Sequence, residues 1–268
     1  MPRRARLDAP STLHHVIIRG IENRSIFADN VDREKFLTRL DRLVQETDTK
    51  IYAWALLPNH AHFLLRSGSK GLSNFMRRLL TGYAQEYNRR HKRNGHLFQN
   101  RYKSIVCQEE IYFQQLVRYI HLNPLRAGLV QDLKQLEDYK WSGHGILMGK
   151  REYSWQDSKY VLSWFANTLR KARKIYQPFV ADGVKQGRRP DLVGGGLIRS
   201  VGGWSMVRGS QISKQRGLAD ERILGKDDFV EKILKEAEQK VKSSFPLNLR
   251  SQKIAERKGK IRGQTFKI

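Results

Sequence analysis

The stretch KIYAWALLPNHAHFLLR, residues 50–66, decides the fold. Residues 50–57 and 60–66 are apolar and rich in β-branched and aromatic side chains, and each run has the length of one strand. Pro58 and Asn59 between them form a sharp turn signal. The stretch therefore predicts a tight β-hairpin. Because residues 50–57 are apolar on both faces, we expect this strand to be central in its sheet.

The sequence on either side of the hairpin alternates helices with strands. Residues 13–19 (LHHVIIR) predict a strand that Gly20 closes. Apolar residues at helical spacing predict an amphipathic helix over 32–46, with Asp32 as its N-cap. A long helix is expected over 71–90, with an apolar stripe on one side and arginines on the others.

A strand over 102–107 and a helix over 109–122, which Pro124 stops or bends, complete the order β-α-β-β-α-β-α. This is the split βαβ, ferredoxin-like order with one extra helix. We expect an α+β fold in which a four-stranded antiparallel sheet carries helices on one face.

The composition indicates an anionic partner. The chain of 268 residues has 51 Lys and Arg against 26 Asp and Glu, a formal net charge of +25. Such an excess attracts polyanions, and nucleic acid is the first candidate. No apolar run approaches the roughly 20 residues that span a bilayer, and the N-terminus lacks the apolar stretch of a signal peptide. Cys107 is the single cysteine, which excludes an internal disulfide. We expect a soluble, intracellular protein that does not bind membranes.

The character of the chain changes near residue 150. We expect one domain over 1–150 and a mainly helical, basic extension over 151–268. The extension comprises a helix over 158–179, a Gly- and Arg-rich linker over 183–204, a helix over 226–242 that begins near Asp227 or Asp228, and a basic tail over 250–268.

His60 and His62 are the first candidates for chemistry. They stand two apart in a predicted strand, so both imidazoles lie on one face of the sheet. Two imidazoles side by side can bind one divalent cation, and a third ligand would leave positions open for a substrate oxygen. The alternative is a pair of histidines that only form hydrogen bonds at a strand end, because a bare His-x-His pattern is weak.

Four strings in order carry a family resemblance. They are LPNHAHFLL at 57–65, YNRRH at 87–91, GHLFQNRYK at 95–103 and RYIHLNPLRAG at 118–128. Together they resemble the single-tyrosine HUH transposases, and within them the REP-associated tyrosine transposases (RAYTs). The resemblance covers about residues 10–145.

The resemblance implies a metal-dependent enzyme that cleaves and rejoins single-stranded hairpin DNA. The family's nucleophile is a tyrosine on the helix after the fourth strand, and Tyr112 is our choice. Tyr119 is the rival, since seven residues make nearly two turns, but we expect it to pack in the core beside Ile120. Attack would give a 5′-phosphotyrosine link and a free 3′-hydroxyl. Mg²⁺ or Mn²⁺ would polarise the scissile phosphate.

The third metal ligand is open. Relatives often place a polar side chain one helical turn after the tyrosine, but the residue four after Tyr112 is Leu116, which cannot bind a metal. Gln115 is our candidate. His121 is an alternative, although packing or capping explains it better.

Basic side chains around the long helix are expected to contact DNA phosphates. Phe98 and Tyr102 lie among these charges and could stack on unpaired bases. The expected phosphate contacts are Arg77, Arg78, Arg89, Arg90, Lys92, Arg93, Arg101 and Lys103.

The expected partner is single-stranded, hairpin-forming DNA in the cytoplasm, in association with the nucleoid, and a homodimer is one expected state. The stretch DERILG at 220–225 resembles the C-terminal extension of longer relatives, and we expect that extension to be shortened here. Two other functions remain open: an inactive hairpin-DNA-binding regulator, and an RNA-binding protein on the same sheet architecture.

Overall fold

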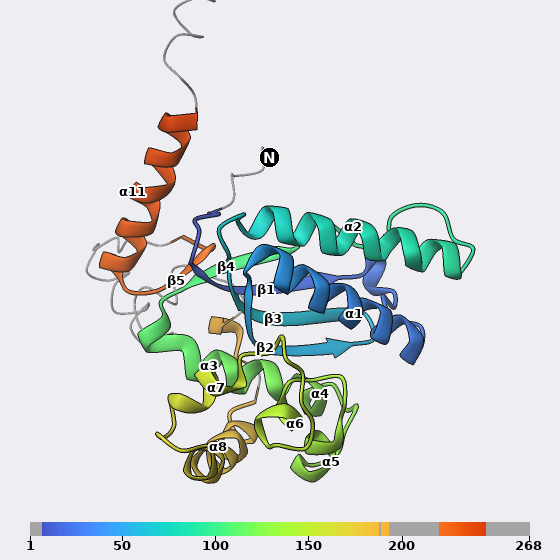
Figure 1. Ribbon diagram of the computed structural model, residues 1–268, viewed down its shortest axis with the longest axis vertical. Coiled ribbons are helices and arrows are strands. Elements are labelled where there is room, and N and C mark those ends of the chain that lie inside the picture. The colour runs from blue at the N-terminus through green and yellow to red at the C-terminus, as the bar shows by residue number, and fades with distance from the viewer. Residues whose placement is uncertain (1–6, 188, 193–219, 245–268) are drawn as a thin grey trace, which may run out of the picture.

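The structure is a computed structural model that describes residues 7–187, 189–192 and 220–244. Most of the expected linker, from residue 193 on, and the basic tail over 250–268 lie outside the described residues. The centre of the fold is a five-stranded sheet in the order β2-β3-β1-β4-β5 (Figure 1). The strands are β1 (Leu13–Arg19), β2 (Lys50–Leu57), β3 (His60–Arg66), β4 (Lys103–Cys107) and β5 (Ile223–Leu224).

The expected α+β fold is confirmed. Strands β1 to β4 pair antiparallel, and the predicted bounds of β1, β2 and β3 are those observed. The sequence did not predict β5, a short strand that pairs parallel to β4 through Val106 and Ile223.

The expectation that residues 50–57 form a central strand is wrong, because β2 lies at the end of the sheet. Its side chains are buried on both faces because helices cover both. Its outer edge is also occupied: Leu56 N donates to Trp141 O (2.8 Å) and Gly143 N donates to Trp54 O (2.9 Å). The loop over 141–143 thus satisfies backbone groups that a further strand would otherwise pair.

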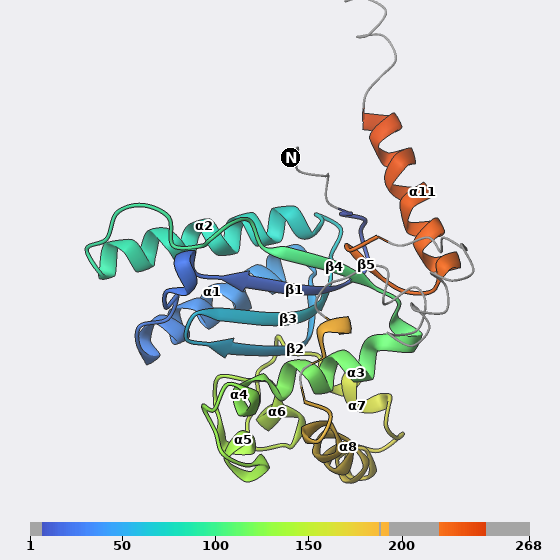
Figure 2. The ribbon, with the colours of Figure 1, turned by 180° about the vertical axis from the view of Figure 1, so that it is seen from behind.

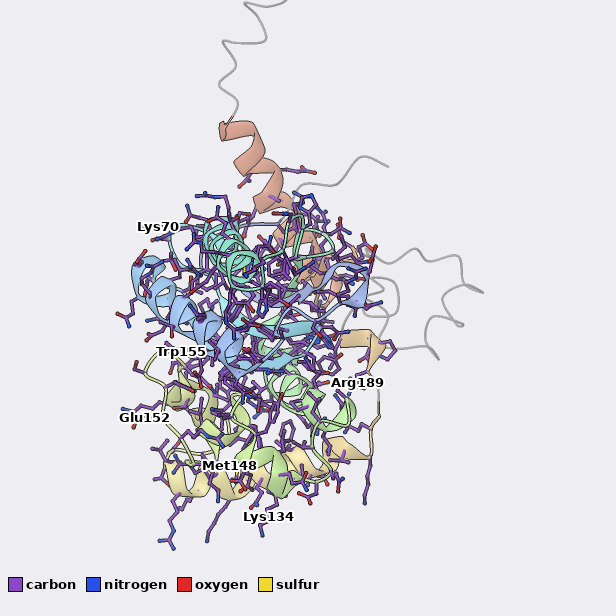
Figure 3. All side chains as sticks on the ribbon, turned by 90° about the vertical axis from the view of Figure 1, so that its right-hand side faces the viewer. Lys70, Lys134, Met148, Glu152, Trp155 and Arg189 are labelled. Atoms are coloured by element: carbon purple, nitrogen blue, oxygen red, sulfur yellow. The ribbon has the colours of Figure 1, made fainter. Side chains whose placement is uncertain are left out.

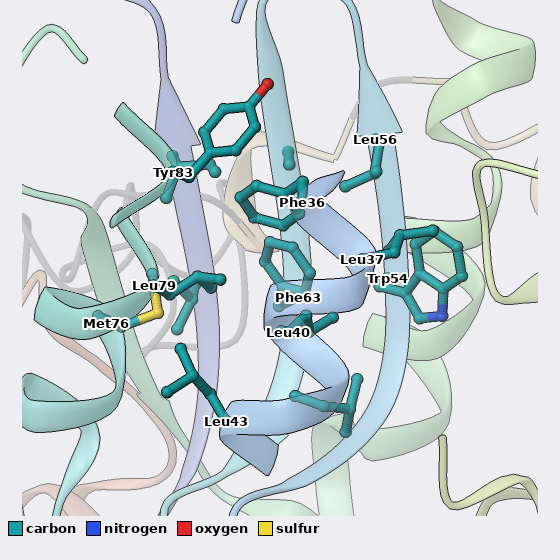
Figure 4. Packing of buried hydrophobic residues seen from close by; sticks show 14 of the residues in the cluster. Phe36, Leu37, Leu40, Leu43, Trp54, Leu56, Phe63, Met76, Leu79 and Tyr83 are labelled. Carbon is teal, nitrogen blue, oxygen red and sulfur yellow. The ribbon is translucent and has the colours of Figure 1, made fainter. Parts of the chain in front are cut away.

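Helices α1 (Asn30–Thr47) and α2 (Leu72–Arg90) cover one face of the sheet, as expected. Figure 4 shows Phe36 and Leu40 of α1 close to Phe63 of β3, inside the cluster that joins both helices to the sheet. The predicted N-cap Asp32 is wrong. Asp29 is the N-cap and accepts from Asp32 N (3.0 Å), while the Asp32 side chain accepts from Ala28 N (2.8 Å).

A second layer of helices packs against the opposite face, beyond the one-sided arrangement that we expected. Helix α3 (Glu109–His121) lies across β2 and β3 there. Its neighbours gather beside it in both views of the ribbon (Figures 1 and 2). They are α4 (Asn123–Arg126), α5 (Leu133–Asp138), α6 (His144–Leu147), α7 (Ser158–Ser163), α8 (Leu169–Val184) and the 3-10 turn η2 (Pro190–Leu192).

Residues on both sides of position 150 share this second core, because Val161 and Tyr176 lie in the same cluster as Phe113 of α3. The helix expected over 158–179 is two helices, α7 and α8, and Thr168 caps the second through its hydroxyl. The last described helix is α11 (Asp227–Ser244), which packs through Val230 beside β5 and extends away from the body (Figure 1).

Candidate functional site

Strand β3 directs His60 and His62 to the face of the sheet that carries α3, as the period of two predicts. Their ring centroids are 5.2 Å apart. His60 pairs in register with Arg19 of β1, while His62 pairs with Ile17. His62 is buried, with 4 % of its surface exposed, and His60 is half-buried.

The sequence analysis did not single out His15, which joins this pair from β1. His15 Nε2 lies 3.1 Å from His62 Nδ1, and the two rings are stacked with centroids 5.3 Å apart. On its other side, His15 Nδ1 lies 3.1 Å from the carbonyl oxygen of Leu192. The sequence does place His15 on the same face of its strand as Leu13 and Ile17. That this face lies beside His62 depends on the register between β1 and β3.

The hydrogen bonds around His62 determine its tautomer. A carbonyl oxygen only accepts, so His15 Nδ1 must carry the proton that is donated to Leu192. In a neutral imidazole His15 Nε2 then has a lone pair and accepts from His62 Nδ1–H. His62 is left with an unprotonated Nε2.

His60 has the same tautomer by a different route. Its Nδ1 lies 2.6 Å from Asn59 Oδ1. The amide nitrogen of Asn59 donates to Asn23 O (3.2 Å), which identifies the other amide atom as the oxygen. His60 Nδ1 therefore donates, and His60 Nε2 carries the lone pair.

Both histidines are held in the neutral form that binds metals. Burial, and to a smaller extent the neighbouring Arg19, lower the pKa of His60 to about 4. Burial also lowers the pKa of His62 well below its ordinary value, with His15 and His60 adding to the effect. Neutral imidazoles whose Nδ1–H groups are already bonded fit the requirements of metal-ligating histidines.

The structure brings Tyr119, and not Tyr112, to the histidines. The Tyr119 ring lies edge-on to His62 and to His15, with centroids 6.0 and 5.9 Å away. The guanidinium of Arg126 lies over the same ring, 5.2 Å from its centroid. Tyr119 also packs against the core that contains Ile120, as we expected, so its contact with the histidines is an additional one.

Tyr112 lies at the beginning of α3, seven residues or about 10 Å along the helix axis from Tyr119. It packs at the border of the second core. Its charged neighbour is Arg189, whose pKa is raised first by hydrogen bonds to Asp191 and further by Tyr112. Figure 3 labels Arg189 at the level of the sheet, far from Lys134 at the other end of the molecule.

The expected third ligand, Gln115, is occupied elsewhere. Its side-chain oxygen accepts from Arg189 Nη2 (3.2 Å) and its amide donates to Ile111 O (3.2 Å). His121 is buried with Nδ1 2.8 Å from the hydroxyl of Tyr176, which agrees with a packing role. In the part of the chain that the structure describes, no three His, Cys, Asp or Glu side chains are grouped so as to hold a metal ion.

Asn123 stands four residues after Tyr119, about one helical turn further along the chain. It is buried, with 8 % of its surface exposed. Its amide nitrogen donates to Ile120 O (3.3 Å), so its oxygen is the atom that could accept or coordinate. A carboxamide oxygen is a suitable ligand for Mg²⁺ or Mn²⁺.

Two of the expected phosphate contacts, Arg90 and Arg78, form ion pairs within the chain. Arg90 binds Asp29 (2.5 Å) and the buried Asp32 (2.6 Å) at the start of α1, and Arg78 forms an ion pair with Glu46. Arg93 lies over the ring of Tyr87, with its Cζ 5.7 Å from the centroid. Other expected side chains are exposed: Arg77, Arg89, Lys92, Arg101 and Lys103.

A groove of about 820 Å³ runs between α2 and the segment 95–102. Tyr102 is buried, so it is not free to stack on a base, whereas Phe98 is half-buried on the groove wall. The segment is tied to the end of β1 by Ile21 N to Leu97 O (3.0 Å). Side chains that line the groove include Met76, Arg77, Leu80, Leu97 and Arg101.

Residues 10–123 match the family model described as Transposase IS200 like, which confirms the resemblance to this family over that part of the chain. A search of curated proteins finds no match. Within the described residues, no helix combines the length and apolar character needed to cross a bilayer.

Two solved structures are similar to this chain. One is a REP-associated tyrosine transposase bound to a REP hairpin, with 15 % identity and a TM-score of 0.47 over 59 % of this chain and 98 % of that one. The other is described as a transposase from Deinococcus radiodurans R1, with 14 % identity and a TM-score of 0.32 over 50 % of this chain and 98 % of that one.

Proposed function

We propose that this chain is a single-strand DNA nuclease and strand transferase that uses Tyr119 as its nucleophile. The observation that carries the proposal is the edge-on contact between Tyr119 and His62, with His60 beside them on the same face. The proposed substrate class is single-stranded DNA that folds into a hairpin, and one similar solved structure is bound to a REP hairpin.

In the proposed reaction the Tyr119 hydroxyl oxygen attacks the scissile phosphorus. A bond forms between that oxygen and phosphorus while the bond from phosphorus to the 3′ oxygen breaks. The proton lost by the phenol is balanced by one gained at the leaving 3′-hydroxyl. The link formed is a 5′-phosphotyrosine, and attack by a 3′-hydroxyl reverses the step, so no nucleotide cofactor is needed.

His60 and His62 would hold a divalent cation, Mg²⁺ or Mn²⁺, through their Nε2 atoms. We propose Asn123 as the amide oxygen ligand in place of Gln115. When bound, such a cation polarises the scissile phosphate and neutralises charge on its oxygens. Because His60, His62 and Tyr119 come from one chain, the proposed chemistry does not require a second copy, and the homodimer stays a prediction.

The hairpin is proposed to bind through the exposed basic side chains around the groove of α2, chiefly Arg77 and Arg101. Both line the groove, and the half-buried Phe98 offers a ring on its wall. Contacts of this kind bind phosphates without a choice of sequence. The segment that forms the groove wall also pairs with the end of β1, where Arg19 lies beside His60.

A cleavage assay tests the proposal. End-labelled single-stranded hairpins are incubated with the protein in Mn²⁺ or in EDTA, and wild type is compared with Tyr119→Phe and the matched control Tyr112→Phe. Metal-dependent cleavage that only Tyr119→Phe abolishes is the expected result. Salt-sensitive binding without cleavage over a wide panel of hairpins would instead favour the inactive regulator. That alternative is supported by the described residues, which place no third His or acidic side chain with His60 and His62.

A further inference from the structure

We infer that His15 is a positioning residue that sets the tautomer and the orientation of His62. The inference rests on the proposed function, because it makes His15 the support of a metal ligand. His15 itself is not a ligand here, since both of its ring nitrogens are used: Nδ1 with Leu192 O and Nε2 with His62 Nδ1, each at 3.1 Å.

The direction of each hydrogen bond carries the argument. Leu192 O cannot donate, so the proton on His15 lies on Nδ1 and its Nε2 can only accept from His62. His62 then has its proton on Nδ1 and a free lone pair on Nε2. If His15 presented a donor instead, His62 would have to accept at Nδ1 and would carry its proton on Nε2, where a cation cannot bind.

Buried side chains surround the hydrogen bond between His15 and His62. His15 is fully buried, and the ring of Tyr119 lies edge-on to both His15 and His62, so the three rings pack against one another. Leu192 is also buried, with 1 % of its surface exposed. The chain from Leu192 through His15 thus ties the proposed ligand to the segment that follows α8.

Two substitutions separate the two hydrogen bonds. The carboxamide of glutamine reaches about as far as Nε2 of histidine, so His15→Gln keeps an acceptor for His62 Nδ1–H. The shorter carboxamide in His15→Asn reaches about as far as Nδ1, so it keeps a donor for Leu192 O and removes the acceptor. His14→Gln is the matched control, because His14 is equally buried on the same strand but bonds Thr12 and Ser104 on the other face.

The first readout is nitrogen-15 NMR of the histidine rings in metal-free protein, which reports the protonated nitrogen directly. We expect His62 to carry its proton on Nδ1 in wild type, in His14→Gln and in His15→Gln, and to lose this preference in His15→Asn. The second readout is Mn²⁺ affinity without DNA, followed by electron paramagnetic resonance of free Mn²⁺. We expect a loss of about tenfold or more in His15→Asn and little change in His15→Gln.

A wild-type His62 protonated on Nε2 would overturn the inference, and so would a folded His15→Asn protein that binds Mn²⁺ as wild type does. The failure of the proposed function looks different. If wild type binds no Mn²⁺ but His62 carries its proton on Nδ1 and loses it in His15→Asn, the role of His15 stands and the metal site does not.

Discussion

The ring of Tyr119 lies edge-on to the imidazole of His62, with centroids 6.0 Å apart. This relationship joins α3 to the sheet, because Tyr119 lies near the end of α3 and His62 lies near the start of β3. It selects Tyr119 from two tyrosines that the helix places on nearly the same side.

The first prediction concerns the proposed ligands. His60→Ala removes one Nε2 lone pair, and we expect cleavage to fall about 100-fold or more because a ligand is lost, while hairpin binding stays within about threefold. Parallel cleavage and binding titrations check this. Unchanged cleavage with Mn²⁺ would show that His60 holds no catalytic metal.

The second prediction separates basic residues that bind DNA from those that hold the fold. Arg77→Ala and Arg101→Ala should each weaken hairpin binding and lower the slope of log affinity against log salt by about 0.7 to 1. Arg78→Ala, whose side chain pairs with Glu46, is the matched control on α2 and should leave the slope unchanged. If the salt dependence of binding fell more in Arg78→Ala than in Arg77→Ala, the assignment of Arg77 as the phosphate contact would be contradicted.

For Arg90 we predict an effect on the stability of the fold. Its loss leaves the buried carboxylate of Asp32 with one cationic neighbour fewer, so Arg90→Ala should lower the free energy of unfolding. The exposed Arg89 beside it is the control and should have almost no effect on stability. Urea denaturation of both variants measures this, and equal stabilities would refute the structural role of Arg90.

The buried histidines predict a loss of stability in mild acid. Burial lowers the pKa of His14 to about 4, against a raising effect of Asp8, and burial lowers the pKa of His144 to about 4. The unfolded chain, with a histidine pKa near 6.5, therefore binds more protons between about pH 6.5 and 4, so stability is complete above this window and falls as the pH drops through it.

Each such histidine should lower the free energy of unfolding by about 2 kcal/mol at pH 5 relative to pH 7. Urea titrations at the two pH values check this, with His144→Phe as the variant whose pH dependence should shrink. The carboxylates of Glu46 and Glu86 have pKa values lowered by their basic partners, Arg78 and Lys35 respectively, so their contribution is lost at lower pH. A stability that is flat from pH 7 to pH 5 would be inconsistent with neutral buried histidines.

Tyr176 is expected to be a stabilising residue of the second core. Its hydroxyl lies 2.8 Å from His121 Nδ1 and 2.9 Å from His144 Nδ1, and all three side chains are buried. Tyr176→Phe leaves both imidazoles without this partner and should cost about 1–3 kcal/mol of unfolding free energy. Tyr160→Phe, at a half-buried position, is the comparison, and thermal unfolding that is equal in both would count against the network.

The hairpin and its bounds could be predicted because the signals for them are local: the length of each apolar run, its apolar content and the Pro58-Asn59 turn between the two runs. The position of β2 at the end of the sheet could not be predicted. A strand that is apolar on both faces fits a central strand and an end strand covered by two helix layers equally well, and the covering residues come from α3 and from the loop over 141–143.

The candidate site divides in the same way. The common face of His60 and His62 follows from the period of the strand, but the choice between Tyr112 and Tyr119 depends on which turn of α3 lies over β3. His15 needed the register between β1 and β3, which places it diagonally beside His62. Such long-range pairings are set by packing of distant segments and leave no local pattern.

The most direct test maps the covalent link. The protein is trapped on a single-stranded hairpin with Mn²⁺, the DNA is trimmed by nuclease, and tryptic peptides are sequenced by mass spectrometry. Trypsin separates the two candidates, because Tyr112 lies in the peptide 104–118 and Tyr119 in the peptide 119–126. We predict a nucleotide adduct on Tyr119, and an adduct on Tyr112 would contradict the proposed site.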